Sequence, residues 1–260
     1  MKIAFALLWG AFSTIALSIV EKEGNPMLKN GLGFLEVPYV AQTLEGGEKE
    51  TLVVNLHQVD CTTFVEYVLA MSLCPSQGED MQKEDFIKNL RHIRYRDGEI
   101  NGYPSRLHYF SDWINDNVRM GIIEDVTAAH SSTTTHLSLS YMSTHPELYE
   151  QLKNFPENVA VMFGYEKALS GQTVHWTPKE EIPAEGFSWI KDGDIIAITT
   201  TIPGLDISHV GIAIYVMGEL HLLHASLSKG KVIVEEVPLN QQLSKNKNML
   251  GVRVLRMRKK

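Results

Sequence analysis

The stretch VDCTTFVEYVLAMSL, residues 59–73, determines how the rest of the chain is organised. Apolar residues recur in it with helical spacing and form one stripe, at Phe64, Val65, Val68, Leu69 and Leu73. Asp60 belongs to the residue types that favour the N-cap, so we expect a helix with Cys61 at its first position. Free amide groups and the helix dipole favour a thiolate there, and thiolate is the nucleophilic form of cysteine. Cys61 is therefore a candidate nucleophile, although most free cysteines only pack in a core.

The chain has two cysteines, Cys61 and Cys74. On one helix they would be about 20 Å apart, because each residue rises roughly 1.5 Å. A disulfide requires Cα atoms within about 7 Å, so we expect no bridge between them. Cys61 is then free to react, whereas Cys74, just before Pro75, is expected only to pack.

Composition is that of a globular protein, with 44% hydrophobic and 21% charged residues among 260. This length suits one large domain, which we expect to span residues 21–260. The net charge of −7 gives no indication of a nucleic-acid partner. The basic tail from Arg256 is short and is interpreted as a solvated end.

Residues 1–20 have one lysine followed by an apolar run, which resembles a secretory signal peptide with a cleavage site near residues 16–18. The alternative is a buried N-terminal helix, because Gly10, Ser13 and Thr14 interrupt the run. The signal predicts a periplasmic or secreted protein without stable membrane insertion once the signal is removed. No other segment approaches the roughly 18 apolar residues that a membrane span needs.

Helical patterns dominate the first half of the chain. Apolar spacing predicts helices over residues 84–94 and 105–119. Alternation predicts a half-exposed strand from Leu137 to Tyr141, and Pro146 suits the start of a short helix to Lys153. Residues 155–185 carry no clear pattern.

From Asp192 onward the pattern changes to short strands rich in valine and isoleucine. About five are expected: DIIAITT, SHVGIAIYV, LHLLHAS, KVIVEEV and LGVRVLRM. Their short connections predict an antiparallel meander. Helices first and a sheet last predict an α+β fold.

Two histidines in neighbouring strands are candidates to assist Cys61. A two-residue turn within residues 217–219 would oppose residues whose numbers sum to an odd value. His209 and His224 would then point to the same side, within about 8 Å on the diagonal. Gly211 is small and leaves space beside the imidazole. His209 is thus the candidate base and His224 the residue that orients it.

Other roles for the residues around His209 have weaker support in the sequence. Asp206 or Ser226 could orient His209 instead. His221 and His224 resemble a metal-ligand pair only on a helix, since three-residue spacing on a strand sends them to opposite faces. We therefore expect no metal site.

The motifs DCTTFVE, GLDISHVGIAIY and LLHAS resemble those of the papain-like cell-wall cysteine hydrolases of the NlpC type. Within that group the chain is most similar to the N-acetylmuramoyl-L-alanine amidase-like family, long a domain of unknown function. The similarity extends to FLEVPYVAQTLE, SRLHYFSDWI, WTPKEEI and GDIIAITTTIPGLDISH. One departure is Glu36, where the family usually has glycine. The resemblance implies a papain-like α+β fold.

The resemblance also implies a Cys61–His209–His224 constellation, with Tyr39 beside the nucleophile. It implies hydrolysis of the amide between muramic acid and L-alanine in soluble peptidoglycan fragments (muropeptides), without metal or organic cofactor, by a protein expected to be a monomer. Residues expected to contact the substrate are Asp60, Arg106, His108, Tyr109 and Ser208. Two alternatives are an NlpC-type endopeptidase that cuts between D-glutamate and the diamino acid, and a non-catalytic wall-binding module.

Overall fold

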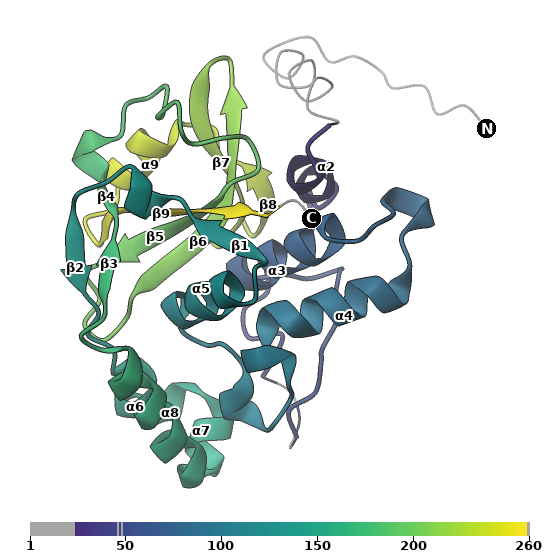
Figure 1. Cartoon of the computed structure of the whole chain (residues 1–260), viewed down its shortest axis with the longest axis vertical. Coiled ribbons are helices and arrows are strands. Elements are labelled where there is room, and N and C mark those ends of the chain that lie inside the picture. Colours follow the sequence, from purple (N-terminus) through teal and green to yellow (C-terminus); the bar gives the residue numbers. More distant parts are fainter. Residues whose placement is uncertain (1–23, 46, 48, 259–260) are drawn as a thin grey trace.

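The computed structural model describes residues 24–258 except 46 and 48, so the predicted signal peptide lies outside the described residues. Helices α3 (Cys61–Ser72), α4 (Lys83–Arg94) and α5 (Phe110–Arg119) lie beside a sheet built mainly from the second half of the chain (Figure 1). The expected α+β class is confirmed. Within the described part of the chain, no helix is long and apolar enough to cross a membrane.

The predicted helices of the first half are confirmed, with one difference in their bounds. Helices α3 and α4 agree with the prediction within two residues. The third, predicted over residues 105–119, begins only at Phe110. The reason is local: Tyr103–Ser105 forms a 3-10 turn and Arg106 has extended backbone dihedrals, φ −68° and ψ 139°.

Seven strands of the described chain form one antiparallel sheet in the order β1-β9-β5-β6-β7-β8, with β4 paired to β9. They are β1 (Ile123–Asp125), β4 (Thr177–Pro178), β5 (Ile195–Thr200), β6 (Ile207–Val216), β7 (Glu219–Ser226), β8 (Lys231–Val234) and β9 (Met249–Met257). All five predicted strands are present. Strands β5 to β8 form the expected meander, whereas β9 returns beside β5 after helix α9 (Leu239–Ser244).

The turn between β6 and β7 has two residues, as the histidine argument requires. Met217 and Gly218 both have positive φ, 51° and 85°, and Val216 pairs with Glu219. Such turns match the twist of a β-hairpin. Directly opposed residues, such as Ile212 and Leu223, therefore have numbers with an odd sum, and the predicted parity is confirmed.

The region between the helices and the sheet differs from the prediction. The strand expected over residues 137–141 is wrong: β2 (Thr134–His136) pairs instead with β3 (Thr173–His175), and α6 covers Tyr141–Thr144. Residues 146–153 form a 3-10 turn (Pro146–Leu148) followed by α7 (Glu150–Asn154). Helix α8 (Pro156–Leu169) was not predicted. Its apolar residues form no single stripe, and Phe163 is 58% exposed.

The sheet is covered on both faces. Val210, Ile212 and Ile214 belong to the core that includes residues of α3, α4, α5 and the N-terminal helix α2 (Pro26–Leu32). Ala213 and Leu222 face the other way and belong to the core that includes residues of α9. This alternation is the one predicted for β6. It directs His209 and His224 away from Val210 and Ile212.

Candidate active site

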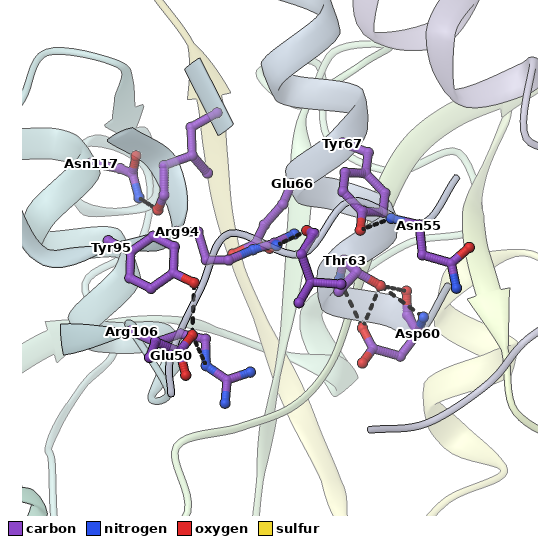
Figure 2. Close-up of polar contacts among 12 residues, drawn as sticks. Glu50, Asn55, Asp60, Thr63, Glu66, Tyr67, Arg94, Tyr95, Arg106 and Asn117 are labelled. Carbon is purple, nitrogen blue, oxygen red and sulfur yellow. Dashed lines mark hydrogen bonds and ion pairs between the residues drawn. The ribbon is translucent and has the colours of Figure 1, made fainter. Parts of the chain in front are cut away.

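The start of α3 carries Cys61 in the predicted position. The Asp60 carboxylate accepts a hydrogen bond from the Thr63 amide at 2.8 Å, and the Thr63 hydroxyl accepts one from the Asp60 amide at 2.9 Å. Figure 2 shows this reciprocal cap. It satisfies amide groups that the helix leaves without partners and fixes the direction of its first turn. Cys61 is half-buried, and both cysteines are free, as expected.

The surroundings of the sulfur do not favour the thiolate that the helix start led us to expect. Hydrogen bonds from the Val210 amide and from the amide and hydroxyl of Thr62 lower the pKa of Cys61. Burial, followed by the negative charge of Asp60, acts in the opposite direction and prevails, raising that pKa to about 11. The expectation of a ground-state thiolate is therefore wrong, because the cost of burying the charge exceeds the stabilisation from the local donors.

The hydrogen bond to Val210 places the sulfur at the end of β6 that carries His209. The pairing between β6 and β7 begins at Ile212 and Leu223. Val210 lies before this paired segment of β6, and the Val210 amide donates a hydrogen bond to the Cys61 sulfur. Val210 directly follows His209 in the chain, so the sulfur contacts the backbone of the residue next to the histidine.

His209 and His224 form a direct pair, as the parity argument predicted. Nε2 of His209 and Nδ1 of His224 are 2.6 Å apart, and the two rings lie edge to face with centroids 4.9 Å apart. His224 is buried, whereas His209 is half-buried. Burial, and secondarily the charge that His224 would carry, lowers the pKa of His209 to about 3. His209 is therefore a neutral imidazole, and its Nδ1 is the nitrogen not engaged by His224.

Glu235 completes this group and was missed by the sequence analysis. Its Oε2 lies 3.4 Å from Nε2 of His224, and that contact lowers the pKa of Glu235. The β7–β8 register opposes Ser226 to Lys231 and Leu223 to Val234, so Glu235 continues onto the face of Leu222 and His224. The same parity argument could have found it. The length of the turn between these strands was not evident in SLSKGK.

Tyr39 lies within electrostatic range of the nucleophile. Its amide donates to the Gly230 carbonyl at 2.8 Å, which ties this segment to the β7–β8 turn. Burial, then Cys61 and Asp60, raises the pKa of Tyr39 to about 12. The phenol therefore stays protonated and can donate a hydrogen bond. Nearby Glu36 has φ 71°, a conformation that favours glycine, which explains why the family usually has glycine there.

Three residues predicted to contact substrate instead make contacts within the protein. Arg106 is 6% exposed and pairs with Glu45 at 2.7 Å and Glu50 at 3.4 Å; Figure 2 shows it beside Glu50. His108 contacts the Tyr103 carbonyl through Nε2 at 3.0 Å.

Tyr109 is buried too. Its hydroxyl donates to Glu166 at 2.6 Å and accepts from the Met142 amide at 2.9 Å. The geometry therefore does not support a substrate contact for Arg106, His108 or Tyr109, because Glu166 of α8 and two glutamates of the loop before α3 engage this segment.

Ser208 lines a groove beside the two histidines. The groove has a volume of about 630 Å³ and also includes Glu235 and Lys229 in its lining. The Ser208 hydroxyl oxygen is buried and makes no hydrogen bond with the described protein. The contact between Ser208 and substrate stays a prediction, and the geometry of the groove allows it. Asp60, by contrast, already uses its carboxylate in the helix cap.

The fold and the site together define a class: an α+β domain of papain-like architecture, with a cysteine at the start of a helix and a histidine pair on the adjoining sheet. The chain belongs to the N-acetylmuramoyl-L-alanine amidase-like family, whose model matches residues 29–252.

Solved structures of similar chains share this fold, and one of them, from Bacteroides uniformis, carries the amidase name. A Bacteroides uniformis protein named N-acetylmuramoyl-L-alanine amidase is 56% identical, with TM-score 0.89, over 91% of this chain and 100% of that one. A Bacteroides fragilis protein named a putative xylanase is 62% identical, with TM-score 0.86, over 88% and 99%. A Legionella pneumophila protein at 23% identity and TM-score 0.69 shares the fold over 95% and 94%. No protein with a curated description matches the chain.

Proposed function

We propose that this chain is a cysteine-dependent N-acetylmuramoyl-L-alanine amidase. Its substrates would be muropeptides, and it would hydrolyse the amide between muramic acid and L-alanine. Family membership and the name of the Bacteroides uniformis relative support the bond type. The observation that carries the cysteine mechanism is the His209–His224 contact of 2.6 Å at the strand end whose Val210 amide contacts Cys61.

The contacts of the two histidines assign one tautomer to each. The Glu235 carboxylate lies 3.4 Å from Nε2 of His224 and favours a proton on that nitrogen, so Nδ1 of His224 is left as an acceptor. It then accepts from Nε2–H of His209. Nδ1 of His209 keeps its lone pair and can take a proton. In this way Glu235 and His224 orient the base, as the third member of a catalytic triad does in other hydrolases.

Thiol and imidazole are both neutral before reaction, so proton transfer accompanies attack. His209 takes the proton of Cys61 as the sulfur bonds to the lactyl carbonyl carbon. The negative charge that develops on the carbonyl oxygen is stabilised by the Cys61 amide at the helix start and by the Tyr39 hydroxyl. Because Tyr39 remains protonated, it can serve as a donor at neutral pH.

The second half of the reaction reverses the proton path. His209 gives its proton to the departing amine of L-alanine, the C–N bond breaks, and the muramoyl group remains on sulfur as a thioester. Water, deprotonated by His209, then attacks the thioester and regenerates the Cys61 thiol. No step in this scheme needs a metal or an organic cofactor.

The name of the Bacteroides fragilis relative raises glycoside hydrolysis as a second reading, but the site supports it poorly. Glycosidases generally use two carboxyl groups on either side of the bond. Of the described residues that line the groove, Glu235 alone carries a carboxylate, and it contacts His224. Amidase activity therefore remains the proposed function.

Digestion of defined muropeptides by wild type and Cys61→Ala tests the proposal. Mass spectrometry should find free intact stem peptide with wild type and none with the variant. A sugar fragment that keeps L-Ala-D-Glu, with the diamino-acid fragment released, would support the endopeptidase instead. Equal function of both proteins in wall binding, without any cleavage, would support the non-catalytic module.

We also propose that the protein acts in the periplasm or outside the cell, on the basis of residues 1–20. N-terminal sequencing of the protein recovered from a periplasmic fraction should give a start after residues 16–18. Recovery from the cytoplasm with Met1 intact would refute this.

A further inference from the structure

The groove beside the two histidines, which we call the histidine groove, carries an excess of positive charge. Among the described residues that line it, Lys229 and Lys245 are cationic, and Glu235 is the one carboxylate. Glu235 contacts His224, so the two ammonium groups are the charges of the groove that have no part in the histidine pair. The whole chain has a net charge of −7, so this local excess of positive charge does not follow from its composition.

The two lysines come from different elements of the fold. Lys229 lies in the turn between β7 and β8, and the Tyr39 amide donates to the carbonyl of Gly230 in the same turn at 2.8 Å. The turn is therefore tied to a residue that lies within electrostatic range of Cys61. Lys245 directly follows α9, which packs on β7 and β9. A ligand in the histidine groove thus lies between two elements that each supply a cation.

Neither ammonium group is neutralised by a close ion pair within the described part of the chain. The Nζ atom of Lys229 lies 3.9 Å from Glu236, and the two side chains are 48% and 81% exposed. Ion pairs between such solvated groups contribute little. Lys245 is exposed and forms no ion pair with any described residue. Both lysines can therefore pair with an anionic ligand without breaking a strong contact in the protein.

The lining also contains uncharged polar groups that have no partner in the described protein. They are the hydroxyl oxygen of Ser208 and Oε1 of Gln242, and both atoms are buried. Gln242 lies three residues before Lys245, on the same flank of α9, whereas Leu239 and Leu243 turn into the core. Buried polar groups in native proteins are nearly always hydrogen-bonded, so these two atoms point to a polar ligand.

An acidic peptide matches this set of groups. Its amide groups donate and accept hydrogen bonds, as the Ser208 hydroxyl and the Gln242 side-chain amide also do. In the stem peptide of a muropeptide, the second residue, D-glutamate, is joined through its side-chain carboxyl, so its α-carboxylate is free. Two extended residues span about 7 Å, which is the reach from the cleaved bond to that carboxylate. The groove volume of about 630 Å³ is within the range of small-molecule sites and suits a short peptide.

We propose that Lys229 and Lys245 select stem peptides whose second residue is D-glutamate over those that carry D-isoglutamine, in which a neutral amide replaces the α-carboxylate. The identity of the ligand as a stem peptide rests on the proposed function. The groove itself requires only an acidic peptide. Ser208 and Gln242 bind uncharged groups that both stems share, so the two lysines determine the specificity. They act on the α-carboxylate and take no part in bond cleavage.

Binding of free stem peptides tests this selection without relying on cleavage. Calorimetric titration of Cys61→Ala protein with L-Ala-γ-D-Glu-diaminopimelate and with its D-isoglutamine counterpart gives the two affinities. The acidic peptide should bind roughly tenfold more tightly, the lower end of the effect of a hydrogen bond to a charged group. In the same background, Lys229→Gln/Lys245→Gln should bind both peptides equally. The control Lys153→Gln/Lys247→Gln makes the same charge change at exposed residues outside the groove lining and should keep the preference.

Equal affinity of the Cys61→Ala protein for the two peptides would overturn the selection, and so would a preference that survives in Lys229→Gln/Lys245→Gln. That variant changes only exposed side chains and should fold normally. Failure of the proposed function looks different. A preference that depends on the two lysines, without cleavage of muropeptides, would leave the selection standing and refute the amidase. Cleavage of D-glutamate and D-isoglutamine muropeptides with equal kcat/KM would do the reverse.

Discussion

Glu235→Gln removes the charge that orients the histidine pair while keeping the shape of the side chain. The glutamine amide can donate to Nε2 of His224, which then carries its proton on Nδ1. His209 would have to accept at Nε2, so its proton would move to Nδ1, the nitrogen that must receive the thiol proton. The variant thus favours the wrong tautomer and should lower kcat with little change in KM.

The size of the effect follows from the geometry. In the serine-protease triad, the equivalent change directly on the base costs about 10⁴-fold in kcat. Glu235 acts through His224, and its contact is long at 3.4 Å. Second-layer partners of this kind are worth roughly 10- to 100-fold in metal sites, and we expect the same range here, or about 1.4–2.7 kcal/mol in the activation barrier.

Steady-state hydrolysis of a defined muropeptide measures the effect, and Glu236→Gln is the matched control. Glu236 is the next residue, its side chain is 81% exposed, and its nearest cation is Lys229 at 3.9 Å. Glu236→Gln should keep wild-type kcat. Equal kcat for the two glutamine variants would refute the assigned role of Glu235, and a raised KM with unchanged kcat would indicate a binding role instead.

Three further predictions concern protonation and packing. The acidic limb of kcat/KM should lie well below pH 6.5, because the pKa of His209 is lowered to about 3. The same lowered pKa affects stability: the contribution of His209 to the unfolding free energy should be complete above pH 6.5. It should fall by at most about 1.4 kcal/mol per pH unit between pH 6.5 and pH 3, since the unfolded chain binds the proton more readily. An acidic limb of kcat/KM near pH 6.5 would contradict both expectations. Alkylation of Cys61 by iodoacetamide should rise about tenfold per pH unit from pH 7 to pH 10, because its pKa is about 11; a plateau above pH 8.5 would show an ordinary thiol. Gly211→Ala should lower the unfolding free energy by about 1–3 kcal/mol, since the added Cβ would lie 2.8 Å from Leu222 and 2.9 Å from the Leu223 carbonyl. The control Gly164→Ala, in open space on α8, should stabilise by about 0.5–1 kcal/mol in thermal unfolding; equal losses would refute the packing argument.

Much of this site could be predicted because its determinants are local. The Asp60 cap and the start of α3 follow from a few adjacent residues. His209 and His224 point to the same side of the sheet because the turn between their strands has two residues, a length that the sequence indicated. Glu235 was missed because its place depends on a longer turn of unknown register.

The misjudged features depend on tertiary burial. Arg106 lies in a polar segment that resembles surface, yet two glutamates distant in sequence enclose it. The pKa of Cys61 depends on how deeply the helix start is covered, and a one-dimensional pattern does not contain that information. Helix α8 was missed because its apolar residues point in several directions.

The composition of the acyl group on Cys61 tests the central claim most directly. Wild type is mixed with a muropeptide, quenched in acid, digested and mapped by mass spectrometry. The account predicts an N-acetylmuramoyl group on the peptide containing Cys61, without any amino acid attached. An adduct that contains L-alanine and D-glutamate, or an acyl group on any other residue, would contradict it.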